Sequence, residues 1–240
     1  MQENTGIQTP YVEDVPAVTS GFGAIEFAEN PEPRVPCLLL LDTSYSMVGN
    51  PISELNNGIQ QFKEELAADS LAAKRVEVAI ITFGSAPDVV LDFTGAQSFQ
   101  PPHLHAEGAT AMGAAIEEGL RRLEARKQMY KVNGLAYFRP WVFLITDGSP
   151  TDSVSQAAVR VHAGEANKAF SFYGVGAGPN VDFNQLNAIC PSDRPAVKLE
   201  GLRFRELFSW LSKSMSSVSR SAPGTSAALP APTGWISAPT

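Results

Sequence analysis

Residues 36–47 read PCLLLLDTSYSM, an apolar run that stops at Asp42 and is followed by two serines, Ser44 and Ser46. Because the run shows no polar alternation, it predicts a strand buried on both faces, as in a parallel sheet covered by helices. The pattern then places one carboxylate and two hydroxyls where the strand leaves the sheet. A hard cation such as Mg2+ takes oxygen ligands of this kind and prefers six of them, so further ligands should come from elsewhere in the chain.

Two later segments supply such ligands. Residues 108–113, GATAMG, place a hydroxyl at the start of a predicted helix, and residues 141–148, WVFLITDG, form a second apolar strand that ends in an aspartate. In an open parallel sheet of order 3-2-1-4-5-6, ligands bind outside the carboxyl ends of strands 1 and 4. The two aspartates end the first and fourth predicted strands. The sequence therefore predicts a metal site built from Asp42, Ser44, Ser46, Thr110 and Asp147.

These motifs resemble the metal-ion-dependent adhesion site of the von Willebrand factor A (VWA) domain family, residue by residue, and the resemblance covers about residues 34–218. It implies a bound Mg2+, with Mn2+ or Ca2+ as alternatives, and one coordination position left open for a Glu or Asp of a protein partner. Tyr45 departs from the glycine that bacterial members often have between the two serines.

Four further segments, 39–44, 51–58, 79–84 and 150–152, resemble intracellular bacterial members encoded with tellurite-resistance clusters. This closer resemblance implies a role in a stress-response or signalling system. The partner it implies is a kinase, a phosphatase or an ATPase.

The rest of the chain alternates predicted strands and helices, which indicates an α/β fold. We expect a single Rossmann-like, doubly wound, mostly parallel six-stranded sheet with helices on both faces. The turn at residues 84–87 is so short that the third strand must run antiparallel to the second. After the first strand, the other strands are expected at residues 76–83, 88–93, 141–146, 171–175 and 196–199, and the helices at 51–68, 112–132, 154–169, 182–189 and 204–218.

Charge and composition divide the chain into three parts. Of the formal net charge of -7 over 240 residues, -6 lies in residues 1–33, an acidic segment without Lys or Arg that we expect to be largely flexible. Residues 34–219 form the predicted VWA domain. Because that part is nearly balanced in charge, nucleic acid is not expected as a partner. No apolar run reaches the length of a membrane span, and two cysteines make no disulfide framework, so we expect a cytoplasmic protein without membrane attachment.

Residues 220–240 form a tail rich in Pro, Ala and Ser, and its residues from 221 onward carry no charge. This composition predicts a flexible segment outside the core, whose deletion should change the melting temperature little. Its one apolar doublet near the end, Trp235-Ile236, is a hypothetical docking element for a partner.

One loop allows a different function. His103, His105 and Glu107 precede Thr110, and if they faced the metal, His105 could act as a base in a metal-dependent phosphoester hydrolase. We favour a solvent-facing loop, because no nucleophile and base are visibly paired. The sequence thus indicates a non-enzymatic, metal-dependent protein-interaction module, with the hydrolase as the alternative.

Overall fold

The structure, a computed structural model, describes residues 27, 29–225 and 227–237. Residues 1–26 lie outside the described part, and with them almost all of the acidic segment expected to be flexible. Residues 29–33 are described and are held in place: Glu32 pairs with Arg75 at 2.6 Å, and Asn30 donates a hydrogen bond to the Lys74 carbonyl at 2.7 Å.

The centre of the fold is a seven-stranded sheet in the order β3-β2-β1-β4-β5-β6-β7. Strands β1, β2, β4, β5 and β6 run parallel, and the two edge strands run antiparallel to their neighbours. The predicted order and the antiparallel third strand are confirmed, and a seventh strand is added. The strands are β1 (Val35–Asp42), β2 (Val76–Phe83), β3 (Pro87–Gly95), β4 (Trp141–Thr146), β5 (Ser171–Ala177), β6 (Val197–Leu199) and β7 (Ile236–Ser237).

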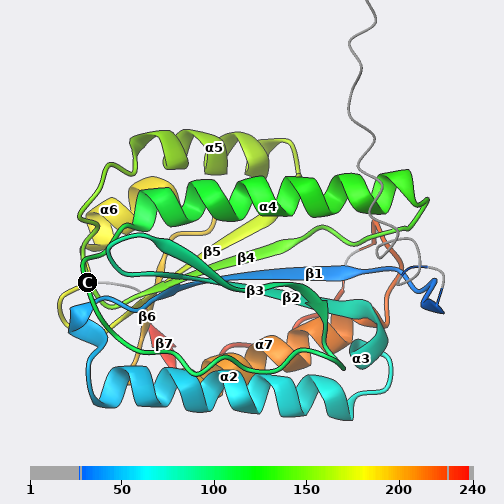
Figure 1. The fold of residues 1–240 in the computed structure, drawn as a ribbon, viewed down its shortest axis with the longest axis horizontal. Helices are drawn as coiled ribbons and strands as arrows, with labels where there is room; N and C mark the ends of the chain where they lie inside the picture. The colour runs from blue at the N-terminus through cyan, green and yellow to red at the C-terminus, as the bar shows by residue number, and fades with distance from the viewer. Residues whose placement is uncertain (1–26, 28, 226, 238–240) are drawn as a thin grey trace, which may run out of the picture.

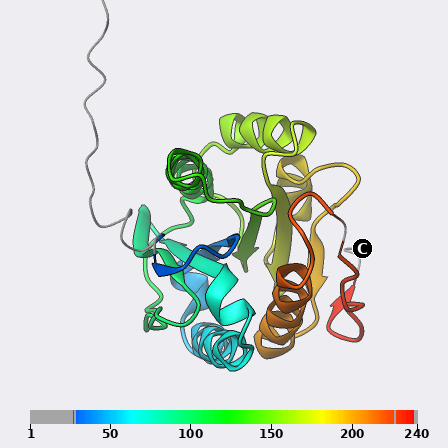
Figure 2. The ribbon, with the colours of Figure 1, turned by 90° about the vertical axis from the view of Figure 1, so that its right-hand side faces the viewer.

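Helices cover both faces of the sheet (Figure 1). One face carries α2 (Asn50–Ala68), α3 (Ala72–Arg75) and α7 (Phe204–Ser219). The other carries α4 (Met112–Val132), α5 (Ser155–Ala166) and α6 (Phe183–Ile189). Figure 2 shows the same three layers at right angles, with the sheet between the two layers of helices. A short 3-10 helix, η1 (Tyr45–Met47), follows β1.

Strand β1 is buried along its whole length, which its apolar run predicted. Its odd-numbered residues, from Val35 to Leu41, pack with α2 and α7, whereas Leu38 and Leu40 pack with α4. Gly119 of α4 allows that close approach, because a Cβ atom there would lie 2.8 Å from a methyl carbon of Leu40. Both faces of β1 are therefore fixed, and its carboxyl end has a defined position.

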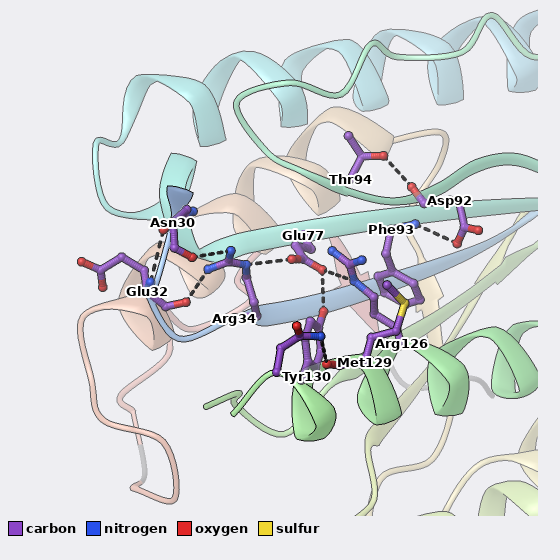
Figure 3. Close-up of polar contacts among 11 residues, drawn as sticks. Asn30, Glu32, Arg34, Glu77, Asp92, Phe93, Thr94, Arg126, Met129 and Tyr130 are labelled. Atoms are coloured by element: carbon purple, nitrogen blue, oxygen red, sulfur yellow. Dashed lines mark hydrogen bonds and ion pairs between the residues drawn. The ribbon is translucent and has the colours of Figure 1, made fainter. Parts of the chain in front are cut away.

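At the amino end of the sheet, a buried carboxylate is fully paired (Figure 3). Glu77 of β2 accepts hydrogen bonds from Arg34 Nε and Arg126 Nε, both at 2.8 Å, and from the Tyr130 hydroxyl. The Phe27 ring lies over the Arg126 guanidinium at 4.9 Å. A buried charge is tolerated when it is paired in this way. The network ties β1, β2 and α4 together, far from the carboxyl ends of the strands.

The expectation that the tail lies outside the core is wrong. Trp235 is buried and contacts Trp210 of α7, with ring centroids 5.7 Å apart. The Trp210 Nε1 donates to the Pro230 carbonyl at 2.7 Å, and Glu200 N donates to the Trp235 carbonyl at 2.9 Å. The tail then forms β7 beside β6. The Trp235-Ile236 doublet, hypothesised as a docking element for a partner, packs on its own domain.

Replacing Trp235 with Ala should lower the free energy of unfolding by about 3 kcal/mol, because it removes a large buried aromatic side chain. Urea denaturation checks this, with Thr233→Ala, an exposed position two residues earlier, as the matched control. Equal midpoints for Trp235→Ala and the wild type would show that the tail contributes nothing to stability.

Candidate metal centre

The carboxyl ends of β1 and β4 meet at one place because the two strands pair in parallel. Leu41 lies opposite Ile145 in this register, which brings Asp42 beside Thr146 and Asp147. Asp42 is fully buried, and Asp147 is 7% exposed. The two aspartates predicted from sequence are therefore neighbours at the point where the sheet connections leave in opposite directions.

The Asp42 carboxylate is held in one orientation. Its Oδ1 accepts from Ser44 N at 2.8 Å, and its Oδ2 accepts from Thr146 Oγ1 at 2.6 Å. Thr146 Oγ1 in turn accepts from Gly148 N at 3.2 Å. Sequence reasoning missed Thr146. The sequence shows only that Thr146 carries a hydroxyl at the end of an apolar strand. The pairing register of β1 and β4 is needed to see that this hydroxyl faces Asp42.

The two serines link the strand ends. Ser44 Oγ and Ser46 Oγ are 2.9 Å apart, and Ser46 Oγ donates to Asp147 Oδ1 at 2.6 Å. The turn of η1 places both hydroxyls on one side, and it is closed by Met47 N donating to the Ser44 carbonyl at 3.0 Å. A continuous chain of side-chain oxygens thus runs from the loop after β1 to the end of β4.

Thr110 reaches the same place from the loop before α4. A Cβ atom built on Gly148 would lie 3.7 Å from Ser46 Oγ and 3.8 Å from Thr110 Oγ1, so both hydroxyls border one small volume. Thr110 is buried, and its hydroxyl makes no hydrogen bond within the described part of the chain. The structure therefore brings all five residues of the sequence prediction to one site.

The loop carrying Thr110 is fixed from both sides. Gly108 has a φ of 79°, a conformation that favours glycine, and its carbonyl accepts from Tyr45 N at 3.0 Å. On the other side, Thr110 N donates to Thr151 Oγ1 at 3.0 Å, and Thr151 N donates to the Thr110 carbonyl at 2.9 Å. These contacts position Thr110 without using its own hydroxyl.

Asp152 is a second supporting residue that sequence reasoning did not assign. Helix α4 begins after Ala111, which has no side chain able to cap it. Asp152 supplies the missing acceptor, with Oδ1 bound to Gly113 N at 3.0 Å and Oδ2 to Ala114 N at 2.8 Å. The loop after β4 is thereby attached to the helix that follows Thr110.

The surroundings of both aspartates disfavour the charged form of the carboxyl group. Burial raises the pKa of Asp42, against the opposing effect of hydrogen bonds from Ser44 and Thr146. Burial also raises the pKa of Asp147, and the nearby charge of Asp42 raises it further. The surrounding loops, residues 43–49, 84–86, 96–111 and 147–154, contain no Lys or Arg. Two carboxylates, three hydroxyls and no balancing side-chain cation are a donor set that fits a hard divalent cation.

The histidine loop is built differently. The His103 and His105 rings contact each other edge to face at 4.9 Å, and both side chains are exposed, as is Glu107. Asn56 of α2 fixes the loop by bonding both backbone groups of Leu104, at 2.8 and 3.0 Å. Across the described residues, no group of three or more His, Cys, Asp or Glu side chains is placed to hold a metal. The arrangement does not assemble His103, His105 and Glu107 into a metal centre.

Fold and site together define a class: a Rossmann-like α/β domain with a cluster of carboxylate and hydroxyl oxygens at the switch between β1 and β4. The von Willebrand factor type A domain model matches residues 38–206, and the chain belongs to this family. Members are typically protein-interaction modules without enzymatic activity. The sequence finds no significant match among curated proteins.

Solved structures share the fold. A von Willebrand factor type A protein from Catenulispora acidiphila is 17% identical with a TM-score of 0.58, over 77% of this chain and 43% of that one. The pilus adhesin SpaC from Lactobacillus rhamnosus GG is 14% identical with a TM-score of 0.61, over 78% and 30%. The manganese-loaded Plasmodium vivax TRAP protein is 20% identical with a TM-score of 0.51, over 72% and 71%.

The chain spans less than half the length of the first two of these proteins. At such identities the likeness concerns the fold alone. Among the helices that the structure describes, none combines the length and the apolar character needed to cross a membrane.

If the candidate site holds Mg2+, Thr146→Val should weaken its binding by about 10- to 100-fold, because residues that orient a ligand carboxylate typically contribute that much to metal affinity. The substitution keeps the buried volume and removes the donor to Asp42 Oδ2. Calorimetric titration measures the affinity. Thr146→Ser, which keeps the hydroxyl, should retain near wild-type binding, and equal affinity for the Val variant would contradict a positioning role.

The raised pKa values also predict a pH dependence of the metal-free protein. A carboxyl group whose pKa is higher in the folded state stabilises the fold at low pH, and this contribution is lost as pH rises through the raised pKa. In EDTA, the free energy of unfolding should therefore fall as the pH rises above about 4, the ordinary pKa of an Asp carboxyl, and it should fall by more in the wild type than in Asp147→Asn. Urea denaturation at each pH measures this difference. Identical pH profiles would show that the pKa of Asp147 is not raised in the folded protein.

Proposed function

We propose that this VWA domain is a metal-dependent protein-interaction module. Asp42, Ser44, Ser46, Thr110 and Asp147 would hold Mg2+, with Mn2+ or Ca2+ as alternatives. The observation that carries the proposal is the convergence of two buried carboxylates and three hydroxyls where no Lys or Arg balances them. When bound, the cation would supply an electrophilic coordination position that a Glu or Asp of a partner protein can fill.

The residues of the chain have distinct parts in this proposal. Thr146 and the Ser44 amide hold the Asp42 carboxylate, so that it is oriented before any partner arrives. Thr110 contributes a hydroxyl with no competing hydrogen bond in the described structure. On the rim, Tyr45 is 75% exposed and Val48 is 51% exposed. Such exposed apolar side chains beside a site are available for contact with a partner.

Relatives and local geometry support binding rather than catalysis. One structural neighbour is a pilus adhesin, and another is described as manganese-loaded. Ser44 and Ser46 bond to each other and to Asp147, and in the described residues neither bonds to a histidine that could act as its base. We therefore propose no enzymatic activity for the domain.

The cellular setting is also a proposal. The likeness to proteins of tellurite-resistance clusters supports a stress-response or signalling system in bacteria, with a kinase, phosphatase or ATPase as the partner. Cys37 and Cys190 are both free and buried, which suits the reducing cytoplasm.

The proposal is tested with the full chain in two assays. Mg2+ should raise the melting temperature of the wild type, because a ligand that binds only the folded state stabilises it, and Asp42→Ala should abolish the shift. In pull-downs from lysate, partners should be retained with Mg2+ and lost in EDTA or with Asp42→Ala.

Asp193→Ala, an exposed acidic position with no hydrogen bond or ion pair within the described residues, is the matched control and should behave as the wild type. Recovery of the same partners at equal yield from the wild type and Asp42→Ala, with and without EDTA, would mean that binding uses another face.

A further inference from the structure

A pocket of about 680 Å3 adjoins the candidate metal centre. We call it the acidic pocket; its lining is formed by residues 43, 82, 84–88, 90, 103–105 and 107–108. Thr43 of this lining directly precedes the proposed ligand Ser44, and the Gly108 carbonyl accepts from Tyr45 N at 3.0 Å. The acidic pocket and the metal centre therefore share a wall.

The acidic pocket carries negative charge that is not neutralised. Asp88 and Glu107 line it, both are exposed, and neither carboxylate has a hydrogen bond or ion pair within the described part of the chain. No Lys or Arg lines the pocket, and its two histidines, His103 and His105, form no ion pair with either carboxylate within the described residues. The contrast with Asp92, four residues after Asp88 on β3, is clear, because Asp92 pairs with Arg122 at 2.7 Å.

Thr43 adds a hydroxyl without a protein partner to the wall of the acidic pocket. Thr43 is 7% exposed, and its backbone is fully used: its N donates to the Phe83 carbonyl at 3.0 Å and its carbonyl accepts from Glu107 N at 2.7 Å. Its hydroxyl has no hydrogen bond in the described structure. A donor that enters the acidic pocket can bond to this hydroxyl, because a hydroxyl oxygen is also an acceptor.

We propose that the acidic pocket binds a Lys or Arg side chain of the same partner segment whose carboxylate fills the metal centre. The recognised segment would then carry an acid and a base a few residues apart. Lys and Arg are pure donors, and the carboxylates and hydroxyls of the lining are acceptors, so the two sets are complementary. Since Thr43 and Ser44 are consecutive, with Cα atoms about 3.8 Å apart, one short segment can reach both sites.

This proposal rests on the proposed function and makes it more specific. A metal centre alone would accept any accessible Glu or Asp. The added pocket would discriminate among acidic segments, and would disfavour those with several acids, because Asp88 and Glu107 repel them.

The first experiment uses blocked synthetic peptides with one central Glu and a Lys placed one, two or three residues before or after it, in Mg2+. Matched peptides carry Gln in place of Lys. For the best spacing, the Lys peptide should bind the full chain about tenfold more tightly than its Gln counterpart, as expected for hydrogen bonds to a charged group. In Asp88→Asn/Glu107→Gln this advantage should vanish.

The control variant Asp193→Asn/Glu206→Gln changes the net charge equally at exposed positions outside the lining and should keep the advantage. If Gln peptides bind in a Mg2+-dependent way and no Lys spacing improves them, the further inference fails while the proposed function stands. If the advantage persists in Asp88→Asn/Glu107→Gln, the cation binds elsewhere.

A second measurement is independent of the metal. Butylammonium, titrated to millimolar concentrations in EDTA, should shift the backbone amide NMR signals of Thr43, Ser85 and Gly108 in the wild type. The same signals should stay unchanged in Asp88→Asn/Glu107→Gln. Shifts here combined with no peptide binding in Mg2+ would overturn the proposed function and leave a cation pocket, whereas no shifts would overturn the pocket.

Discussion

The parallel pairing of β1 with β4 is the constraint on which the site depends. It sets the two strand ends side by side, so that Asp42 meets Thr146 in hydrogen-bonding distance and Asp147 follows one residue later. Burial of both faces of β1 prevents that strand from sliding, because a shift by one residue would turn Leu38 and Leu40 out of their packing against α4. The sheet therefore holds the carboxylates of Asp42 and Asp147 in fixed positions.

Buried carboxylates are paired with cationic side chains at the amino end of the sheet but not at its carboxyl end. At the amino end, Glu77 is surrounded by two arginines and a tyrosine, and nothing in its environment calls for a ligand. At the carboxyl end, burial raises the pKa of Asp42 and Asp147, and the nearby loops offer hydroxyls but no cation. The fold tolerates a buried charge that is paired, whereas a buried charge that is left unbalanced is typical of functional sites.

The sequence predicted most of the fold because the apolar runs of the strands and the stripes of the helices are local signals. It also predicted the five residues that the structure gathers, since strand ends and their hydroxyls can be read from spacing. It failed where the answer depends on distant contacts. The position of Thr146 depends on register, and the docking of Trp235 depends on Trp210, a partner that no local pattern in the tail reveals.

The folded domain includes residues beyond the end of the family match, in α7 and in the tail. The family match ends at residue 206, near the start of α7, yet Phe208, Leu211 and Met215 further along that helix lie in the core. Strand β7 then covers the outer edge of the three-residue β6, with Leu199 opposite Ile236. An uncovered edge is a template for pairing with other chains. A fragment cut at the family boundary would expose both a hydrophobic face and an open edge, so aggregation rather than folding is its expected fate.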